Sequence, residues 1–135
     1  MGVTEATSED THSIAAKLRD SQLRTLPADA RIDALVALAG ELLALAEHGN
    51  VDALASSSGL SPDMTRWALR TTFDTVTAAS LSALLASTEL PGHRAVPVGL
   101  ATVLLSGNVL TEPARALLLP LLMGVPVVAR VSSRE

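Results

Sequence analysis

Polar side chains that could bind a ligand follow two apolar segments in the last third of the chain. They are Asn108, which comes after the segment 100–105, and Arg130, Ser132 and Ser133, which lie at or just beyond the end of the segment 125–131. An asparagine amide donates and accepts hydrogen bonds, and an arginine carries a permanent positive charge. Ligands of open α/β sheets bind beyond the carboxyl ends of the strands. We therefore expect these two segment ends to form a ligand-binding edge.

The segments around these residues predict a strand, a helix and a second strand. Residues 100–105 and 125–131 are short apolar runs with β-branched residues, and residues 112–123 form an apolar helix between them. Pro120 should shorten or kink this helix, and Gly124 should end it. Parallel strands are usually buried on both faces and need a crossover connection. We therefore expect this unit to be the front part of a larger sheet.

Residue types alone leave a second interpretation of Ser106, Gly107 and Asn108, which is a polar turn that only closes a strand. The chain also has no G-x-G-x-x-G, no Walker-type phosphate loop, no G-x-S-x-G elbow and no His-rich metal pattern. It has no Cys, which excludes disulfides, thiolate metal sites and a cysteine nucleophile within these residues.

Upstream, residues 13–90 predict a helical region, after a polar segment 1–12 that we expect to be disordered. The clearest helix is 28–47, because its apolar residues recur at spacings of three and four and form one stripe. The stripe consists of Ile32, Leu35, Val36, Ala39, Leu42, Leu43 and Ala46. The other expected helices are 13–26, a short one ending at Ala55, 62–74 and 78–87.

Turn and cap residues separate these helices. We expect Pro27 in the first turn of the helix 28–47, Gly49 in a left-handed conformation at its end, and Asn50 as the cap of the next helix. Ser61 and Thr77 are the expected N-caps of the helices 62–74 and 78–87.

Two residues invite a functional interpretation and receive a structural one. Trp67 shares a helix face with Met64, Ala68 and Thr71, and a single Trp on such a face usually packs the helix on its neighbour. His48 stands in a last helical turn, where the helix dipole favours it on the surface, and no second metal-type ligand lies at helical spacing.

The composition argues against nucleic-acid and membrane-spanning functions. Only Trp67 and Phe73 are aromatic and the net charge is -4, whereas nucleic-acid surfaces use stacked aromatic rings and clustered positive charge. The uncharged segments 95–111 and 116–129 are shorter than the ~20 apolar residues of a transmembrane helix. Acidic residues stand near the N-terminus, where an export signal would be basic, so we expect a cytoplasmic protein.

The order of features also resembles a known family. LLSGNV at 104–109, an apolar helix with ALLLPLLMG and the strand VPVVARVSSRE resemble the acyl-CoA reductase family typified by the fatty-acid reductase of bioluminescence, a branch of the aldehyde dehydrogenase superfamily. The resemblance spans about residues 28–135 and is most specific at the Gly-Asn segment and the strand ending in Arg130. It implies an α/β fold, with a helical N-terminal region followed by an incomplete Rossmann-like β-α-β unit over residues 95–135.

The resemblance also implies a reaction and roles for the polar residues. The family reduces an acyl-CoA or acyl-protein thioester to an aldehyde with NADPH, through an acyl-cysteine intermediate. Asn108 matches the asparagine whose amide stabilises the oxyanion. Arg130 occupies the position of a lysine that contacts the adenosine ribose, and Ser132 and Ser133 occupy a turn that leaves room for a 2'-phosphate.

Departures from the family pattern define the alternatives. Arg130 replaces the lysine and Val131 replaces a common proline, and the family's nucleophilic cysteine lies downstream of the last residue here. We therefore expect an N-terminal part of such a reductase, inactive alone, with a missing C-terminal part or an oligomeric state. A small non-catalytic helical interaction module is the second hypothesis, and direct binding of lipid or an acyl chain by the helices is the third.

Overall fold

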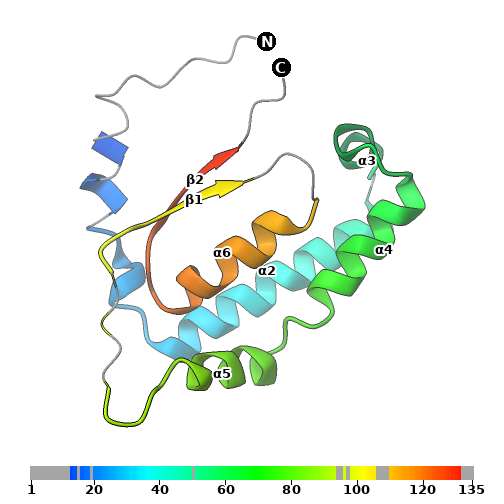
Figure 1. Cartoon of the computed structure of the whole chain (residues 1–135). Helices are drawn as coiled ribbons and strands as arrows, with labels where there is room; N and C mark the ends of the chain where they lie inside the picture. The colour runs from blue at the N-terminus through cyan, green and yellow to red at the C-terminus, as the bar shows by residue number, and fades with distance from the viewer. Residues whose placement is uncertain are drawn as a thin grey trace.

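The structure is a computed structural model that describes residues 13, 14, 16–18, 20–49, 51–93, 96, 98–105 and 110–131. It is a mixed α/β fold, mostly helical, with two short parallel strands. In Figure 1, helix α6 lies between the two strands and helix α2, and helices α4 and α5 lie on the other side of α2. The elements are η1 (Gln22–Arg24), α2 (Ala28–His48), α3 (Asp52–Ser58), α4 (Pro62–Phe73), α5 (Ala78–Ser87), β1 (Ala101–Leu105), α6 (Glu112–Leu122) and β2 (Val127–Val131).

The expected single helix over 13–26 is wrong. Residues 13, 14 and 16–18 are helical, Asp20 lies in a turn, and the short 3-10 helix η1 follows. The Ser21 hydroxyl accepts a hydrogen bond from the Leu23 amide at 3.2 Å. A serine that bonds to the backbone two residues ahead favours a new turn over a continuous helix, which explains the break.

Helix α2 carries the predicted apolar stripe, and Ile32, Ala39 and Ala46 are its buried members. Both of its ends differ from expectation. Pro27 is the N-cap residue with φ -55° and ψ 152°, not a residue of the first turn. Gly49 is extended, with φ -86° and ψ 163°, rather than left-handed. A Cβ at Gly49 would collide with the side chain and carbonyl of Leu45, so close approach requires the glycine.

The caps of the next helices are mostly as predicted. The Ser61 hydroxyl accepts from the Met64 amide at 3.2 Å and begins α4, and Thr77 and Ser80 form a reciprocal capping box that begins α5. Helix α3 has Val51 as its N-cap residue, so the prediction that Asn50 caps it is wrong. Asn50 itself lies outside the described residues.

The prediction that Trp67 anchors α4 on its neighbour is wrong, because its side chain is 60% exposed. The buried face of α4 consists of Thr65, Leu69 and Phe73, which follow one another every four residues. Trp67 is two residues from Thr65 and therefore lies about 160° around the helix from it. This buried face packs on α2, where the small side chains of Ala39 and Ala46 allow close contact.

Two apolar clusters hold the helices together. One contains Ala39, Ala46, Val51, Leu69 and Phe73. The other joins three elements through Ile32 of α2, Leu81 of α5 and Leu122 of α6. Leu122 is fully buried, and burying a leucine stabilises a fold by about 1.5–3 kcal/mol. The second cluster therefore attaches the strand-linking helix to the helical region.

The predicted β-α-β crossover is confirmed. β1 and β2 pair in parallel, from Ala101 opposite Val127 to Leu105 opposite Val131, and α6 connects them. The apolar run 100–105 favours a buried strand, and that expectation is wrong for part of β1. Leu105 is buried, whereas Leu104 is 75% exposed and Thr102 is exposed too. Alternate residues of a strand point to opposite faces, so α6 covers one face of the sheet and no described element covers the other.

Two arginines, Arg24 of η1 and Arg31 of α2, connect the helical region to the β-α-β unit. The Arg31 Nε donates to the Leu122 carbonyl at 2.8 Å, and its Nη1 donates to the Leu26 carbonyl. The Arg24 Nη2 donates to the Val98 carbonyl at 3.0 Å. A positive charge at a helix C-terminus is favourable, so Arg31 satisfies one of the last carbonyls of α6 and fixes the approach to β2.

Candidate functional site

The parallel pairing brings the carboxyl ends of β1 and β2 to the same edge. Leu105 and Val131 are the last pair of the parallel register, so the two strands end at neighbouring positions. Arg130 lies at this edge opposite Leu104, and its side chain is exposed. Asn108, Ser132 and Ser133 lie outside the described residues. Of the four predicted site residues, the structure therefore describes Arg130 alone.

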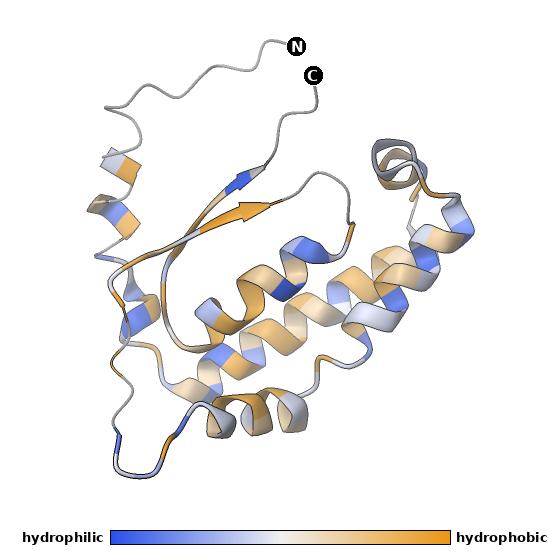
Figure 2. Ribbon diagram, in the orientation of Figure 1, coloured by the Kyte–Doolittle hydropathy of each residue, from blue (hydrophilic) through white to orange (hydrophobic). Residues whose placement is uncertain are grey.

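Arg130 belongs to the uncovered face of the sheet. Paired residues of parallel strands share a face, and its partner Leu104 points away from α6. The strands have mostly hydrophobic colours in Figure 2, with a hydrophilic stretch near the end of β2. An exposed guanidinium at a strand end can bind an anion such as a phosphate through paired hydrogen bonds. Such a residue binds and orients a ligand, and it supplies no nucleophile.

Other chemistry-bearing residues are dispersed. His48 is exposed in the last turn of α2, with its Nε2 3.8 Å from a carboxylate oxygen of Glu47. This agrees with its interpretation as a surface residue. Within the described part of the chain, no group of His, Asp and Glu is arranged to hold a metal ion. No described helix is long and apolar enough to cross a membrane.

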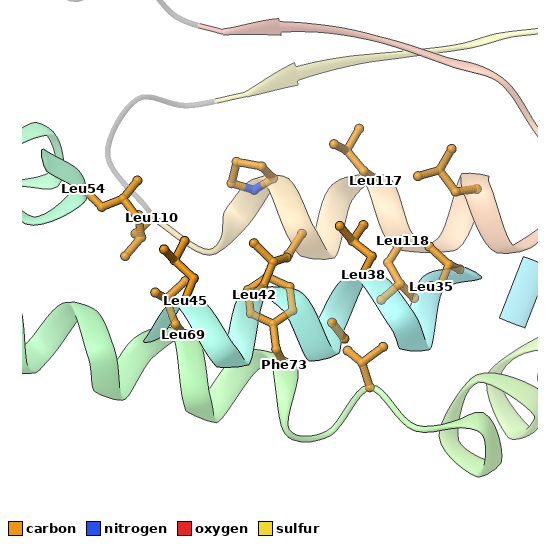
Figure 3. Close-up of a pocket in the computed structure, with 15 residues that line it drawn as sticks. Leu35, Leu38, Leu42, Leu45, Leu54, Leu69, Phe73, Leu110, Leu117 and Leu118 are labelled. Atoms are coloured by element: carbon orange, nitrogen blue, oxygen red, sulfur yellow. The ribbon is translucent and has the colours of Figure 1, made fainter. Parts of the chain in front are cut away.

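An apolar hollow lies elsewhere, between α2, α4 and α6. We call it the α2–α6 cavity; Figure 3 shows it with 15 lining residues, and its volume is about 330 Å³. All of the lining side chains that the structure describes are apolar. They are Leu35, Leu38, Ala39, Leu42, Leu45, Leu54, Leu69, Phe73, Val76, Leu110, Pro113, Ala114, Leu117, Leu118 and Leu121.

Sequence reasoning missed this cavity, although one signal was present. Helix α2 has two leucines outside its apolar stripe, Leu38 and Leu45, which are seven residues apart and both partly exposed. A spacing of seven returns to nearly the same side of a helix. This second apolar row lies beside the predicted stripe and makes the apolar surface of α2 wider than one neighbouring helix can cover. The leucines of the second row line the cavity.

No protein-family model, no curated protein and no solved structure matches this chain.

Proposed function

We propose that the chain forms part of an NADPH-dependent reductase of acyl-CoA or acyl-protein thioesters, and that the carboxyl edge of β1 and β2 is its nucleotide-facing part. The observation that carries the proposal is the in-register parallel pair, which puts Arg130 at the edge where the Asn108 segment leaves β1. This supports the ligand-binding edge expected from the sequence, because α/β sheets bind ligands beyond the carboxyl ends of their strands.

Each polar residue has a distinct role in this proposal. Arg130 would bind a phosphate or ribose group of the nucleotide, and its exposed position at the strand end fits that task. Bound NADPH would supply the hydride. Asn108 would donate from its side-chain amide to the thioester oxygen as negative charge develops there, and Ser132 and Ser133 would lie beside the 2'-phosphate. Because the chain has no Cys, the nucleophile has to come from outside these residues.

Nuclear magnetic resonance titration of the isotope-labelled chain tests the nucleotide-facing edge. One arginine makes few of the contacts that a dinucleotide needs, so we expect weak binding. NADPH should shift resonances of β1 and β2 near Leu105 and Arg130 more strongly than NADH does. The Arg130→Ala variant should lose that difference, and the matched Arg115→Ala variant, with an exposed arginine on α6, should keep it. Equal shifts for both nucleotides, or shifts unaffected by Arg130→Ala, would refute the phosphate contact.

A second candidate function is a non-catalytic interaction module. The observation that favours it is the uncovered sheet face, with Leu104 75% exposed beside the partner strand's Arg130. Parallel sheets normally have both faces covered. If the chain acts in this way, Leu104→Glu should abolish association with a partner and leave the nucleotide titration unchanged.

A further inference from the structure

We propose that the α2–α6 cavity is a binding site for one unbranched alkyl chain, such as that of a medium-chain fatty acid. The inference goes beyond the proposed reductase function, because alkyl binding needs neither a nucleotide nor a nucleophile. It rests on the lining, the shape and the surroundings of the cavity.

The lining excludes most ligand classes. Among the described residues, none with a polar side chain contributes to it. Small-molecule sites normally combine an apolar lining with a few polar groups that fix the orientation of the ligand. A polar ligand in this cavity would lose its hydrogen bonds to water without replacement. The chemistry therefore selects the apolar part of an amphiphile, with its head group left in solvent.

The shape favours a single chain over a helix. The lining follows α2 from Leu35 to Leu45, a rise of about 15 Å. A volume of 330 Å³ spread over that length corresponds to a channel of about 4 Å radius, once a water radius of about 1.4 Å is included. A helix with its side chains has a radius of about 5–6 Å. The cavity therefore accommodates an extended chain of methylene groups, whereas a whole helix exceeds its volume.

Ligand entry does not require the helices to separate. Leu38 and Leu45 line the cavity and are 49% and 37% exposed, so the hollow opens to solvent along α2. Figure 3 shows Leu38 and Leu118 between α2 and α6, and Leu45 near Leu110 at the other end of the hollow. One end of the cavity is at Leu54 and Leu110, near the place where the chain enters α6. The alkyl chain would cover leucine surface that is otherwise wet.

Calorimetric titration of the full chain with dodecanoate, below its micelle concentration, tests the proposal. Each methylene moved from water into an apolar site strengthens binding by about fourfold. We therefore expect dodecanoate to bind in the micromolar range and hexanoate to bind more than a hundredfold more weakly. The proposal is overturned if dodecanoate at submillimolar concentration gives no detectable heat of binding.

Two matched leucines locate the binding site. Leu45 lines the cavity and Leu119 does not, although their exposed fractions are nearly equal at 37% and 38%. Leu45→Gln should weaken dodecanoate binding by about tenfold or more, and Leu119→Gln should leave it unchanged. Equal effects of the two substitutions would show unspecific adsorption and overturn the site.

A cavity-filling variant guards against a folding artefact. Ala114→Leu adds volume inside the cavity, whereas Ala37→Leu adds the same volume at an exposed position of α2. Provided that both variants unfold cooperatively on heating, Ala114→Leu should prevent dodecanoate binding and Ala37→Leu should not. If ultracentrifugation instead shows a dimer that Leu45→Gln dissociates, a second copy occupies the cavity and the alkyl proposal fails. Loss of the NADPH effect at Arg130 has no bearing on either result, so the two proposals fail separately.

Discussion

The helical region and the β-α-β unit differ in how completely they bury their apolar faces. In the helical region, α4 and α5 begin at side-chain caps, and each of α2, α3, α4 and α5 contributes at least one buried residue to the core. In the β-α-β unit, β1 alternates between a buried Leu105 and an exposed Leu104, and Arg130 shares the exposed face. An amphipathic helix needs one covered face, whereas a parallel strand needs two. The difference shows that helical stripes can be satisfied locally and parallel strands cannot.

The largest expected effect concerns the junction between the two regions. Leu122→Ala should lower the free energy of unfolding by about 2–5 kcal/mol, because Leu122 is fully buried between α2 and α5. Urea unfolding followed by circular dichroism measures it. Leu119→Ala, one turn earlier and 38% exposed, is the control and should cost less than about 1 kcal/mol. Equal costs would mean that α6 is not attached through the second cluster.

Gly124→Ala should show how far the junction depends on Arg31. Gly124 has φ +74°, and a Cβ there would lie 3.0 Å from the Arg31 Nη1. The left-handed conformation alone costs a non-glycine residue about 1–2 kcal/mol, and displacing Arg31 should add to it. Gly59→Ala is the control, because Gly59 has φ +72° with open space around it. Thermal unfolding should rank Gly124→Ala as the more destabilising; the reverse order would remove Arg31 from the argument.

Thr65→Val should stabilise the helical region. Thr65 is fully buried, and its hydroxyl oxygen has no hydrogen-bond partner among the described residues. Replacing a buried, unsatisfied hydroxyl by a methyl group of similar size should raise the free energy of unfolding by about 1 kcal/mol. Chemical denaturation checks this, with Thr71→Val at an exposed position of the same helix as a neutral control. A destabilised Thr65→Val variant would mean that the hydroxyl is satisfied in solution.

The smallest effect on stability is expected at the uncovered sheet face. Leu104→Lys should change the free energy of unfolding by no more than about 0.5 kcal/mol, because the side chain is exposed. It should nevertheless reduce self-association, since charged residues protect exposed strands from pairing with other chains. Sedimentation measures the association, and hydrogen exchange should be slower in α2 than in β1. A monomeric wild-type chain with slow exchange in both strands would remove the contrast between the regions.

Local signals in the sequence were sufficient for most of the elements. Ser61 and Thr77 cap the helices that they were expected to cap, and the α2 stripe and the crossover between β1 and β2 are confirmed. These features depend on spacings within a few residues of the chain. The same reasoning predicted the polar strand ends, of which Arg130 lies at the expected edge.

Two failures of the sequence-based prediction concern contacts between elements that are distant in the sequence. Which face of α4 is buried depends on Ala39 and Ala46 of α2, and sequence spacing alone made Trp67 look like the anchor. The α2–α6 cavity requires three helices to be placed relative to one another, and its lining was therefore invisible in any single helix. Other errors are local, because the Ser21 hydroxyl accepts from the Leu23 amide and Gly49 lies against Leu45, four residues earlier.

The hydrogen bond from Arg31 to Leu122 has a consequence for the order of folding. The two residues are 91 positions apart, and Arg24 bonds to a carbonyl 74 positions away. Contacts between such distant residues close large loops and form late. During synthesis, α2, α3 and α4 can collapse on the first cluster while α6 is still inside the ribosome. The hydrogen bond from Arg31 can form only once α6 is outside the ribosome. A ribosome-bound chain should therefore reach its full resistance to proteolysis only after Leu122 has emerged.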